Sequence, residues 1–155
     1  MRSYKPVFNI AKRNDAVAVF LAGTIELGKA DDWQKRVETE ISHLDVNVIN
    51  PRRDVMDPDM PQDYDNPEFY QQCAWELNGL DKSDVIFMCF DPTCKSPISL
   101  LELGLYADSG KIMVVCPNGF WRKGNVDIVC EKYDIPLFDD IESGIEYLKN
   151  VIKSN

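Results

Sequence analysis

The fold is decided by two neighbouring segments, Asp84-Val85-Ile86-Phe87-Met88-Cys89-Phe90 and Ser96-Pro97-Ile98-Ser99-Leu100-Leu101-Glu102-Leu103-Gly104-Leu105-Tyr106-Ala107. The first is an unbroken apolar run, which is typical of a strand buried on both faces. Pro97 suits the first position of a helix, because its missing N–H would have no partner there, and Ser96 is the natural N-cap. We therefore predict a buried strand, a short loop and a helix that runs to about Ser109.

Glu102 lies inside this predicted helix with leucines on both sides. Ligands in open α/β sheets bind at the carboxyl ends of strands, where such helices begin. Glu102 is therefore a candidate functional residue. The alternative is a solvated surface carboxylate whose leucine neighbours face the core.

The same alternation of apolar runs and helical patterns continues along the chain. We predict further strands at 16–21, 46–49, 111–116 and 135–138, and further helices at 33–44, 67–81 and 126–133, with a last helix capped by Asp139 or Asp140. This order predicts a single-domain α/β fold: a doubly wound, flavodoxin- or Rossmann-like parallel sheet of about five strands with helices on both faces. Residues 1–15 are polar and basic and are predicted to form a flexible arm, with the domain spanning 16–155.

The composition excludes several classes of protein. The net charge of −9 argues against binding a nucleic-acid polymer or an anionic membrane, although a small nucleotide needs only a few local donors. The five cysteines include no CxxC pair, and no signal peptide is visible, so we expect reduced thiols and a cytoplasmic protein. The apolar stretches are too short to span a membrane.

The single histidine, His43, makes a histidine-based triad or a multi-histidine zinc site hard to build. Carboxylates are then the expected acid and base of any enzymatic site. GxGxxG and GxxxxGK[ST] are both absent, which argues against a dinucleotide enzyme or a P-loop NTPase.

Several loops follow predicted strands and are candidate binding segments. Gly23 and Thr24 follow the first strand, and Arg52 and Arg53 follow the second. The Asp-rich loop 54–65 lacks the ligand spacing of an EF-hand, and we interpret it as an active-site loop or lid, with a merely solvated loop as the alternative.

The helix at 67–81 has one apolar stripe and one carboxylate beside it. Phe69, Cys73, Leu77 and Leu80 are its predicted inner face, and Glu76 lies on the adjoining face.

Three segments carry a resemblance to a known group of proteins. Leu21–Thr24, Glu76–Asp84 and Leu101–Ala107 resemble the nucleoside 2-deoxyribosyltransferase superfamily in order and spacing, within a match over about residues 17–130. The Glu-Leu-Gly block is the most specific part. The superfamily also contains nucleotide N-glycoside hydrolases.

The resemblance implies roles for individual residues. Glu102 matches the catalytic nucleophile, and Glu76 matches an Asp that contacts the nucleobase and helps to move its proton. Ser96 falls where the deoxyribosyltransferases hold the sugar with an Asp, whereas in the hydrolases serines near this loop, here Ser96 and Ser99, hold the 5′-phosphate. Asn125 resembles an Asn that reaches the sugar in the neighbouring subunit's site.

With this resemblance, Gly23 and Thr24 are expected to line the sugar or base, and Arg52 to lie near a base or phosphate. A helix N-terminus lowers the pKa of a carboxylate, so it favours an ionised Glu102, while an apolar pocket opposes this. No metal and no organic cofactor is implied. A homo-oligomer with sites completed between subunits is implied, and Phe120 and Trp121 would suit its interface.

Three functions follow as hypotheses. The first is a nucleoside 2-deoxyribosyltransferase that acts on a 2′-deoxynucleoside and a free nucleobase through a covalent glycosyl–Glu102 intermediate. The second is a hydrolase of nucleoside 5′-monophosphates that uses the same Glu102. The third is a non-catalytic nucleotide-binding or sensing domain of the same fold.

Overall fold

The computed structural model describes residues 1–6, 15–26, 31–55 and 57–155. Within them the chain forms one parallel sheet, whose strands are β1 Arg2–Tyr4, β2 Val17–Gly23, β3 Val46–Ile49, β4 Val85–Cys89, β5 Ile112–Val115 and β6 Leu137–Phe138. The helices are α1 Trp33–Ile41, α2 Pro67–Lys82, α3 Pro97–Tyr106, α4 Lys123–Lys132 and α5 Ile141–Ser154, and a short 3-10 helix, η1 Ala107–Ser109, directly follows α3. Strands and helices thus alternate as the hydrophobic pattern predicts.

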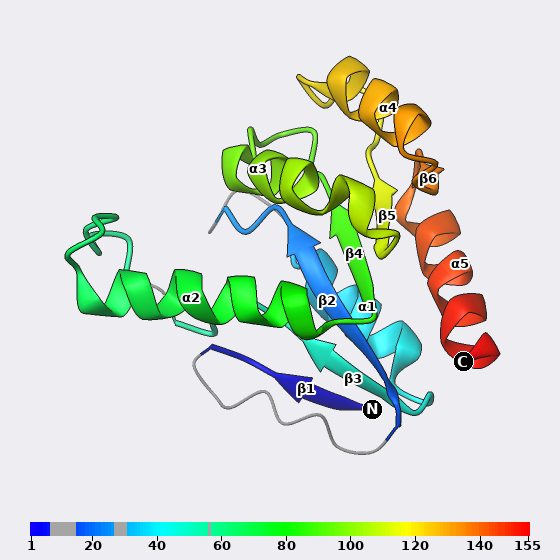
Figure 1. The fold of residues 1–155 in the computed structure, drawn as a ribbon, viewed down its shortest axis with the longest axis horizontal. Coiled ribbons are helices and arrows are strands. Elements are labelled where there is room, and N and C mark those ends of the chain that lie inside the picture. Colours follow the sequence, from blue (N-terminus) through cyan, green and yellow to red (C-terminus); the bar gives the residue numbers. More distant parts are fainter. Residues whose placement is uncertain (7–14, 27–30, 56) are drawn as a thin grey trace.

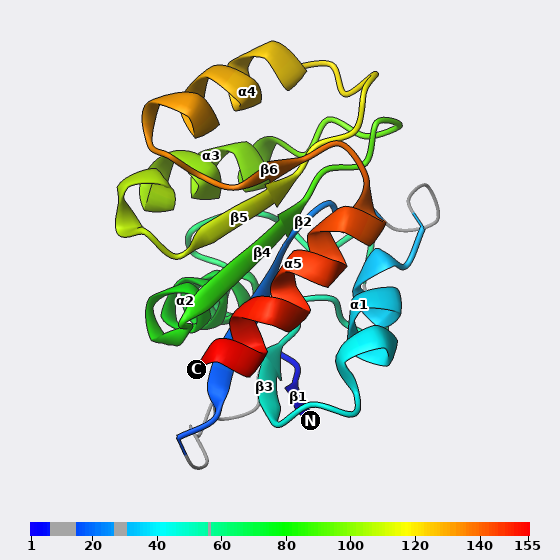
Figure 2. The ribbon, with the colours of Figure 1, turned by 90° about the vertical axis from the view of Figure 1, so that its right-hand side faces the viewer.

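The strands lie in the order β1-β3-β2-β4-β5-β6. Without β1 this is the doubly wound, flavodoxin-like order. α2, α3 and α4 cover one face of the sheet, and α1 and α5 cover the other (Figure 1, Figure 2). The predicted fold class is therefore confirmed.

Successive side chains of the central strands pack into the hydrophobic cores on opposite faces of the sheet. Phe20 and Met88 pack under α2, α3 and α4, whereas Leu21 and Phe87 pack under α1 and α5. Because both faces of the sheet are covered, the sequences of β2 and β4 are unbroken apolar runs and do not alternate between apolar and polar residues.

The first residues of the predicted N-terminal arm form a strand. Arg2–Tyr4 form β1, which pairs in parallel with residues 47–49 of β3, so the described part of the chain has six strands instead of about five. An edge strand held by backbone hydrogen bonds needs no apolar run, which is why the polar sequence gave no signal. Residues 7–14 of the predicted arm lie outside the described residues.

The inner face of α2 also differs from the prediction. Leu77 is 46% exposed, whereas Trp75, Gly79 and Leu80 are buried. Gly79 allows this packing because a Cβ there would lie 2.8 Å from the ring of Phe20. The helix is therefore rotated relative to the predicted stripe, and Glu76 lines a cavity together with Phe69 and Cys73.

Phe120 is not an interface residue. It is buried, with its ring centroid 4.7 Å from that of Phe90, whereas Trp121 is 48% exposed. All five cysteines are free in the structure. Among the described residues, no helix combines the length and the hydrophobicity that a membrane span requires.

Candidate functional site

The candidate site lies where the strand order reverses. β3 lies on one side of β2 and β4 on the other, so a crevice forms at the carboxyl ends of β2 and β4. Gly23 ends β2 with φ +132°, and a Cβ there would lie 2.1 Å from the carbonyl oxygen of Cys89. Only glycine fits this close approach of two strand ends.

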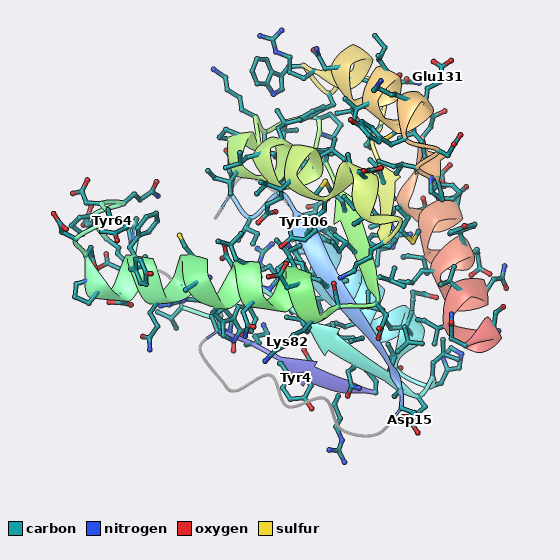
Figure 3. All side chains as sticks on the ribbon, viewed as in Figure 1. Tyr4, Asp15, Tyr64, Lys82, Tyr106 and Glu131 are labelled. Atoms are coloured by element: carbon teal, nitrogen blue, oxygen red, sulfur yellow. The ribbon has the colours of Figure 1, made fainter. Side chains whose placement is uncertain are left out.

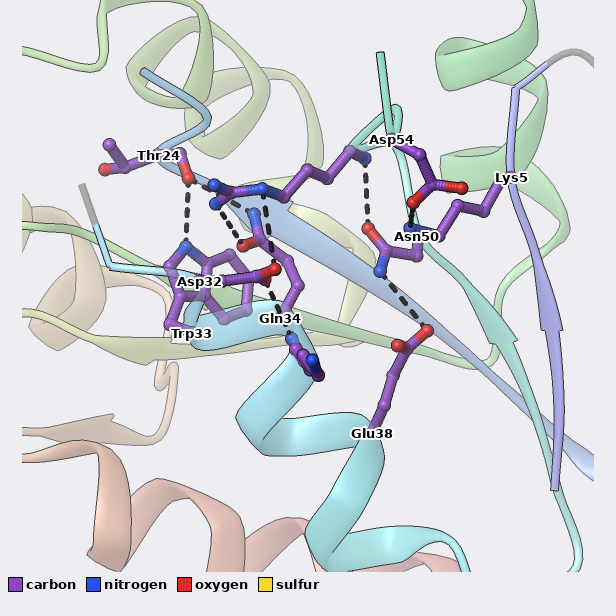
Figure 4. Close-up of polar contacts among 10 residues, drawn as sticks. Lys5, Thr24, Asp32, Trp33, Gln34, Glu38, Asn50 and Asp54 are labelled. Atoms are coloured by element: carbon purple, nitrogen blue, oxygen red, sulfur yellow. Dashed lines mark hydrogen bonds and ion pairs between the residues drawn. The ribbon is translucent and has the colours of Figure 1, made fainter. Parts of the chain in front are cut away.

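The side chain of Thr24 links the loop after β2 to Ser96, the residue that precedes α3. Its Oγ1 accepts a hydrogen bond from the backbone N–H of Asp91 at 3.0 Å and lies 2.5 Å from Oγ of Ser96. Its carbonyl oxygen accepts a hydrogen bond from Nε1 of Trp33 at 2.9 Å (Figure 4). The loop after β2 is thus fixed by both the neighbouring strand and α1.

Ser96 occupies the predicted N-cap position of α3, but its side chain does not cap the helix. Its backbone is left-handed, with φ 50° and ψ 52°, a conformation that costs a non-glycine residue about 1 kcal/mol or more. The contact with Thr24 holds the Ser96 hydroxyl away from the helix. The first N–H groups of α3 are therefore left without a side-chain cap at the edge of the site.

α3 turns its polar face inward. Ser99, Glu102 and Leu103 are buried, and Glu102 is only 8% exposed. Leu101 and Leu105 are 59% and 58% exposed. The alternative in which Glu102 is solvated and its leucine neighbours face the core is therefore wrong for these two leucines and for Glu102 itself.

α2 supplies the second carboxyl group. Phe69, Gln72, Cys73 and Glu76 line the same cavity as Glu102, at the i, i+3, i+4, i+7 spacing of one helix face. Nε2 of Gln72 donates a hydrogen bond to Oε1 of Glu76 at 2.5 Å.

Arg53 holds Gln72 from the other side. Its Nε donates to Oε1 of Gln72 at 2.5 Å, and its guanidinium also donates to Oε1 of Glu68 at 3.0 Å. Arg53, Gln72 and Glu76 thus form a continuous chain of hydrogen bonds along the cavity wall.

These elements enclose a cavity of about 430 Å³, within the range of small-molecule sites. Gly23, Thr24, Ser96 and Ser99 line it beside the two carboxyl groups. Among the described residues, the charged ones that line it are Glu26, Arg53, Asp57, Glu68, Glu76 and Glu102. No cluster of side chains suited to a metal occurs in the described ranges.

The cavity changes the protonation of both carboxyl groups. Burial, with a smaller contribution from the negative charge of Glu76, raises the pKa of Glu102 to about 8. Burial also raises the pKa of Glu76, against the opposing effects of the Gln72 hydrogen bond and the Arg53 charge. Desolvation therefore outweighs the lowering expected from the helix N-terminus, because Glu102 lies beyond the first turn of α3, where that effect acts.

Two of the expected binding residues do not line the cavity. NH1 of Arg52 donates to Oε1 of Gln34 at 3.2 Å, and its Nε lies 3.8 Å from Oδ2 of Asp32. Gln34 in turn donates to the carbonyl oxygen of Thr24 at 3.2 Å (Figure 4). Arg52 thus supports the Thr24 loop from behind. Asn125 is exposed on α4, away from the cavity lining, so it reaches a site only if that site belongs to another copy.

Part of the Asp-rich loop lines the cavity. Asp57, Met60 and Gln62 line it, whereas Asp54 forms an ion pair with Lys5 at 2.7 Å. Tyr64 lies beyond the cavity at the end of α2 opposite Lys82 (Figure 3), where its ring packs edge-on against Tyr70.

Sequence reasoning did not single out Gln72, and it named Arg53 only together with Arg52, as part of a candidate binding segment. Gln72 precedes Glu76 by one helical turn, so the α2 periodicity contained a signal for it. Arg53 carries no such signal, because nothing in two adjacent arginines shows which one a loop turns toward a cavity.

Two comparisons with known proteins bear on this site. No curated protein sequence matches the chain closely enough to name a relative. The sequence model of the family described as nucleoside 2-deoxyribosyltransferase like matches residues 16–120. The match covers both carboxyl-bearing helices, the strand ends between them and most of the chain, and the protein therefore belongs to the nucleoside 2-deoxyribosyltransferase-like family.

Proposed function

We propose that this protein is a nucleoside 2-deoxyribosyltransferase, which cleaves the N-glycosidic bond of a 2′-deoxynucleoside and transfers the 2-deoxyribosyl group to another nucleobase. The observation that carries the proposal is the pair of carboxyl groups, Glu102 on α3 and Glu76 on α2, that line one cavity. Retaining cleavage of a glycosidic bond requires two such groups, one at the anomeric carbon and one that moves the proton of the leaving group.

The two carboxyl groups take different roles. A carboxylate oxygen of Glu102 attacks C1′, the C1′–N bond breaks, and its electron pair goes to the nucleobase nitrogen. Glu76, whose pKa is raised by burial, supplies the proton that the departing base takes up. A second base then attacks C1′, gives its proton to Glu76 and releases Glu102.

The charge of the cavity favours a nucleoside over a nucleotide. Besides Glu76 and Glu102, the described lining residues include the carboxyl groups of Glu26, Asp57 and Glu68 and one cation, the guanidinium of Arg53. Arg53 already pairs with Glu68. A 5′-phosphate would be repelled by this surface, whereas an uncharged nucleoside is not.

One observation favours a second function, hydrolysis of nucleoside 5′-monophosphates. Ser96 and Ser99 are buried beside the cavity, and α3 begins there without a side-chain cap. Uncapped N–H groups at a helix start attract phosphate. We place this second because the carboxylates around the cavity act against a dianion.

A product assay tests the proposal. The protein is incubated with 2′-deoxynucleosides and, separately, with their 5′-monophosphates, each with and without a free acceptor base. The proposal predicts a new nucleoside that forms only when the acceptor is present. Free base and sugar phosphate released from the monophosphates without acceptor would instead establish the hydrolase.

Glu102→Gln is the decisive variant, and Glu131→Gln, an exposed carboxylate on α4, is its control. Loss of the nucleophile lowers kcat by at least about 10³-fold, and the control retains wild-type rates. If Glu102→Gln stays active, Glu102 is not the nucleophile. If wild type binds nucleosides without converting them, the protein is a binding domain.

A further inference from the structure

Gln72 lies between a cation and a carboxyl group, and this fixes the direction of its amide. The guanidinium of Arg53 has only N–H donors, so the side-chain oxygen of Gln72 must face it. The amide nitrogen of Gln72 then has to face Glu76, to which it donates. A flipped amide would place its NH₂ group against the donors of Arg53.

The fixed amide leaves two groups for a ligand. One N–H of Gln72 Nε2 and the second oxygen of Glu76 make no further hydrogen bond within the described ranges. Both side chains line the cavity. A neutral donor and a carboxyl group thus stand side by side on its wall.

This pair matches one edge of a purine. In a 6-oxopurine, N7 takes up a proton as the bond at N9 breaks, and the neighbouring O6 is an acceptor. Glu76 can protonate N7 while the N–H of Gln72 donates to O6. In adenine the exocyclic amino group would place its own donors against that N–H, leaving both unpaired.

We infer that Arg53 and Gln72 form a specificity device that makes the enzyme prefer 6-oxopurine over 6-aminopurine 2′-deoxynucleosides. This inference rests on the proposed function, because it assigns the nucleobase to the Glu76 side of the cavity. Gln72 contacts the base directly, by donating a hydrogen bond to O6. Arg53 is a positioning residue, which acts by holding the Gln72 amide in one orientation.

The test compares kcat/KM for 2′-deoxyinosine with that for 2′-deoxyadenosine, at a fixed concentration of one acceptor base. The wild-type ratio is expected to be at least about tenfold, because a polar site rejects a ligand that leaves its groups unpaired. Gln72→Met removes the donor with little change in length and should bring the ratio within about threefold. The control is Gln71→Met, the exposed neighbour on α2, which should keep the wild-type ratio.

Two further variants keep the inference falsifiable if Gln72→Met does not fold. Gln72→Glu keeps a partner for Arg53 but replaces the donor with acceptors, so the ratio should shift toward 2′-deoxyadenosine. Arg53→Leu frees the amide to flip and should lower the ratio, and Arg53→Lys should restore part of it. A purely structural role for Arg53 would change stability without changing the ratio.

The outcomes separate this inference from the proposed function. If no 2′-deoxynucleoside reacts in the wild type, the proposed function fails. If transfer occurs but the ratio is near one, favours 2′-deoxyadenosine, survives Gln72→Met unchanged, or cannot be measured because only pyrimidine nucleosides react, this inference alone is overturned.

Discussion

At the scale of single residues, the environment of Glu102 decides its chemistry. A carboxyl group that is 8% exposed and shares a cavity with a second carboxyl group is difficult to ionise. Below about pH 8 the protonated form therefore dominates in the free protein. In the proposed mechanism, attack on C1′ requires the ionised form, so we expect the burial of Glu102 to limit activity at low pH.

The buried carboxyl should make folding stability depend on pH. The pKa of Glu102 is about 8 in the folded protein, against 4.5 as its ordinary value. The native state then binds the proton of Glu102 more tightly than the unfolded state does. The stabilising contribution of this proton to the free energy of unfolding is fully present below about pH 4.5. It is lost as pH rises to about 8, by about 1.4 kcal/mol per pH unit.

Glu102→Gln removes this titration and should gain stability relative to wild type as pH rises through that window. Urea unfolding of both proteins at about pH 5 and about pH 8 measures the difference. Glu76 titrates in both proteins, so its contribution largely cancels. Equal pH dependence in the two proteins would contradict the raised pKa.

The pH–rate profile should report the ionisation of Glu102. We expect kcat/KM to rise with pH as Glu102 ionises, with a midpoint near the pKa of about 8.

Glu76→Gln should move the rising limb to lower pH, because the negative charge that raises the pKa of Glu102 is gone. Rates measured over the pH range for both proteins check this. A rising limb that stays in place would show that Glu76 does not act on Glu102.

At the scale of elements, the site depends on how β2 and α3 meet. Gly23 brings the end of β2 against Cys89, and the loop that follows presents Thr24 to Ser96. The left-handed Ser96 then sets the direction in which α3 starts. A small change in the backbone at this junction would move Glu102 relative to Glu76. Misplacement of reacting groups by even about 1 Å lowers the reaction rate strongly.

Gly23→Ala should therefore damage both stability and activity. The added Cβ overlaps the carbonyl oxygen of Cys89, and φ is outside the usual range for alanine. We expect a loss of about 2–4 kcal/mol in the free energy of unfolding.

Gly124→Ala on α4 is the matched control, because a Cβ there meets nothing within 4 Å. It should stabilise slightly, by up to about 1 kcal/mol. Thermal and urea unfolding compare the two variants. Similar effects from both would mean that the strand ends can separate to accept a side chain.

At the scale of the whole molecule, the outer face of α3 is apolar. Ile98, Leu101 and Leu105 are 60%, 59% and 58% exposed, and Ile98 also lines the cavity. An apolar face that continues into a binding site is a typical surface for another subunit. We expect the protein to self-associate through α3, so that a second copy borders the site.

Leu105→Glu should weaken this association by placing a charge in the interface of a protein that already carries a net charge of −9. Light scattering coupled to size-exclusion chromatography measures the change in mass. Asn150→Glu adds the same charge to an exposed position on α5, on the other face of the sheet, and should leave the mass unchanged. A monomeric wild type would refute the expectation.

The sequence by itself determined the alternation of strands and helices, the doubly wound class and the segments that carry the family resemblance. These depend on local periodicity, since a strand covered on both faces must be apolar throughout and a helix must present a repeating face. Glu102 was also found in this way, because the strand before it and Pro97 fixed where its helix begins.

Only the tertiary structure decided which side chains meet in the cavity. Loops have no period, so the sequence could not show that Arg53 lines the cavity while Arg52 turns to Gln34, or that Ser96 binds Thr24 instead of its own helix. The direction of the Glu102 pKa shift was open for a related reason. Desolvation depends on the atoms packed around a carboxyl group, and these come from segments far apart in the chain.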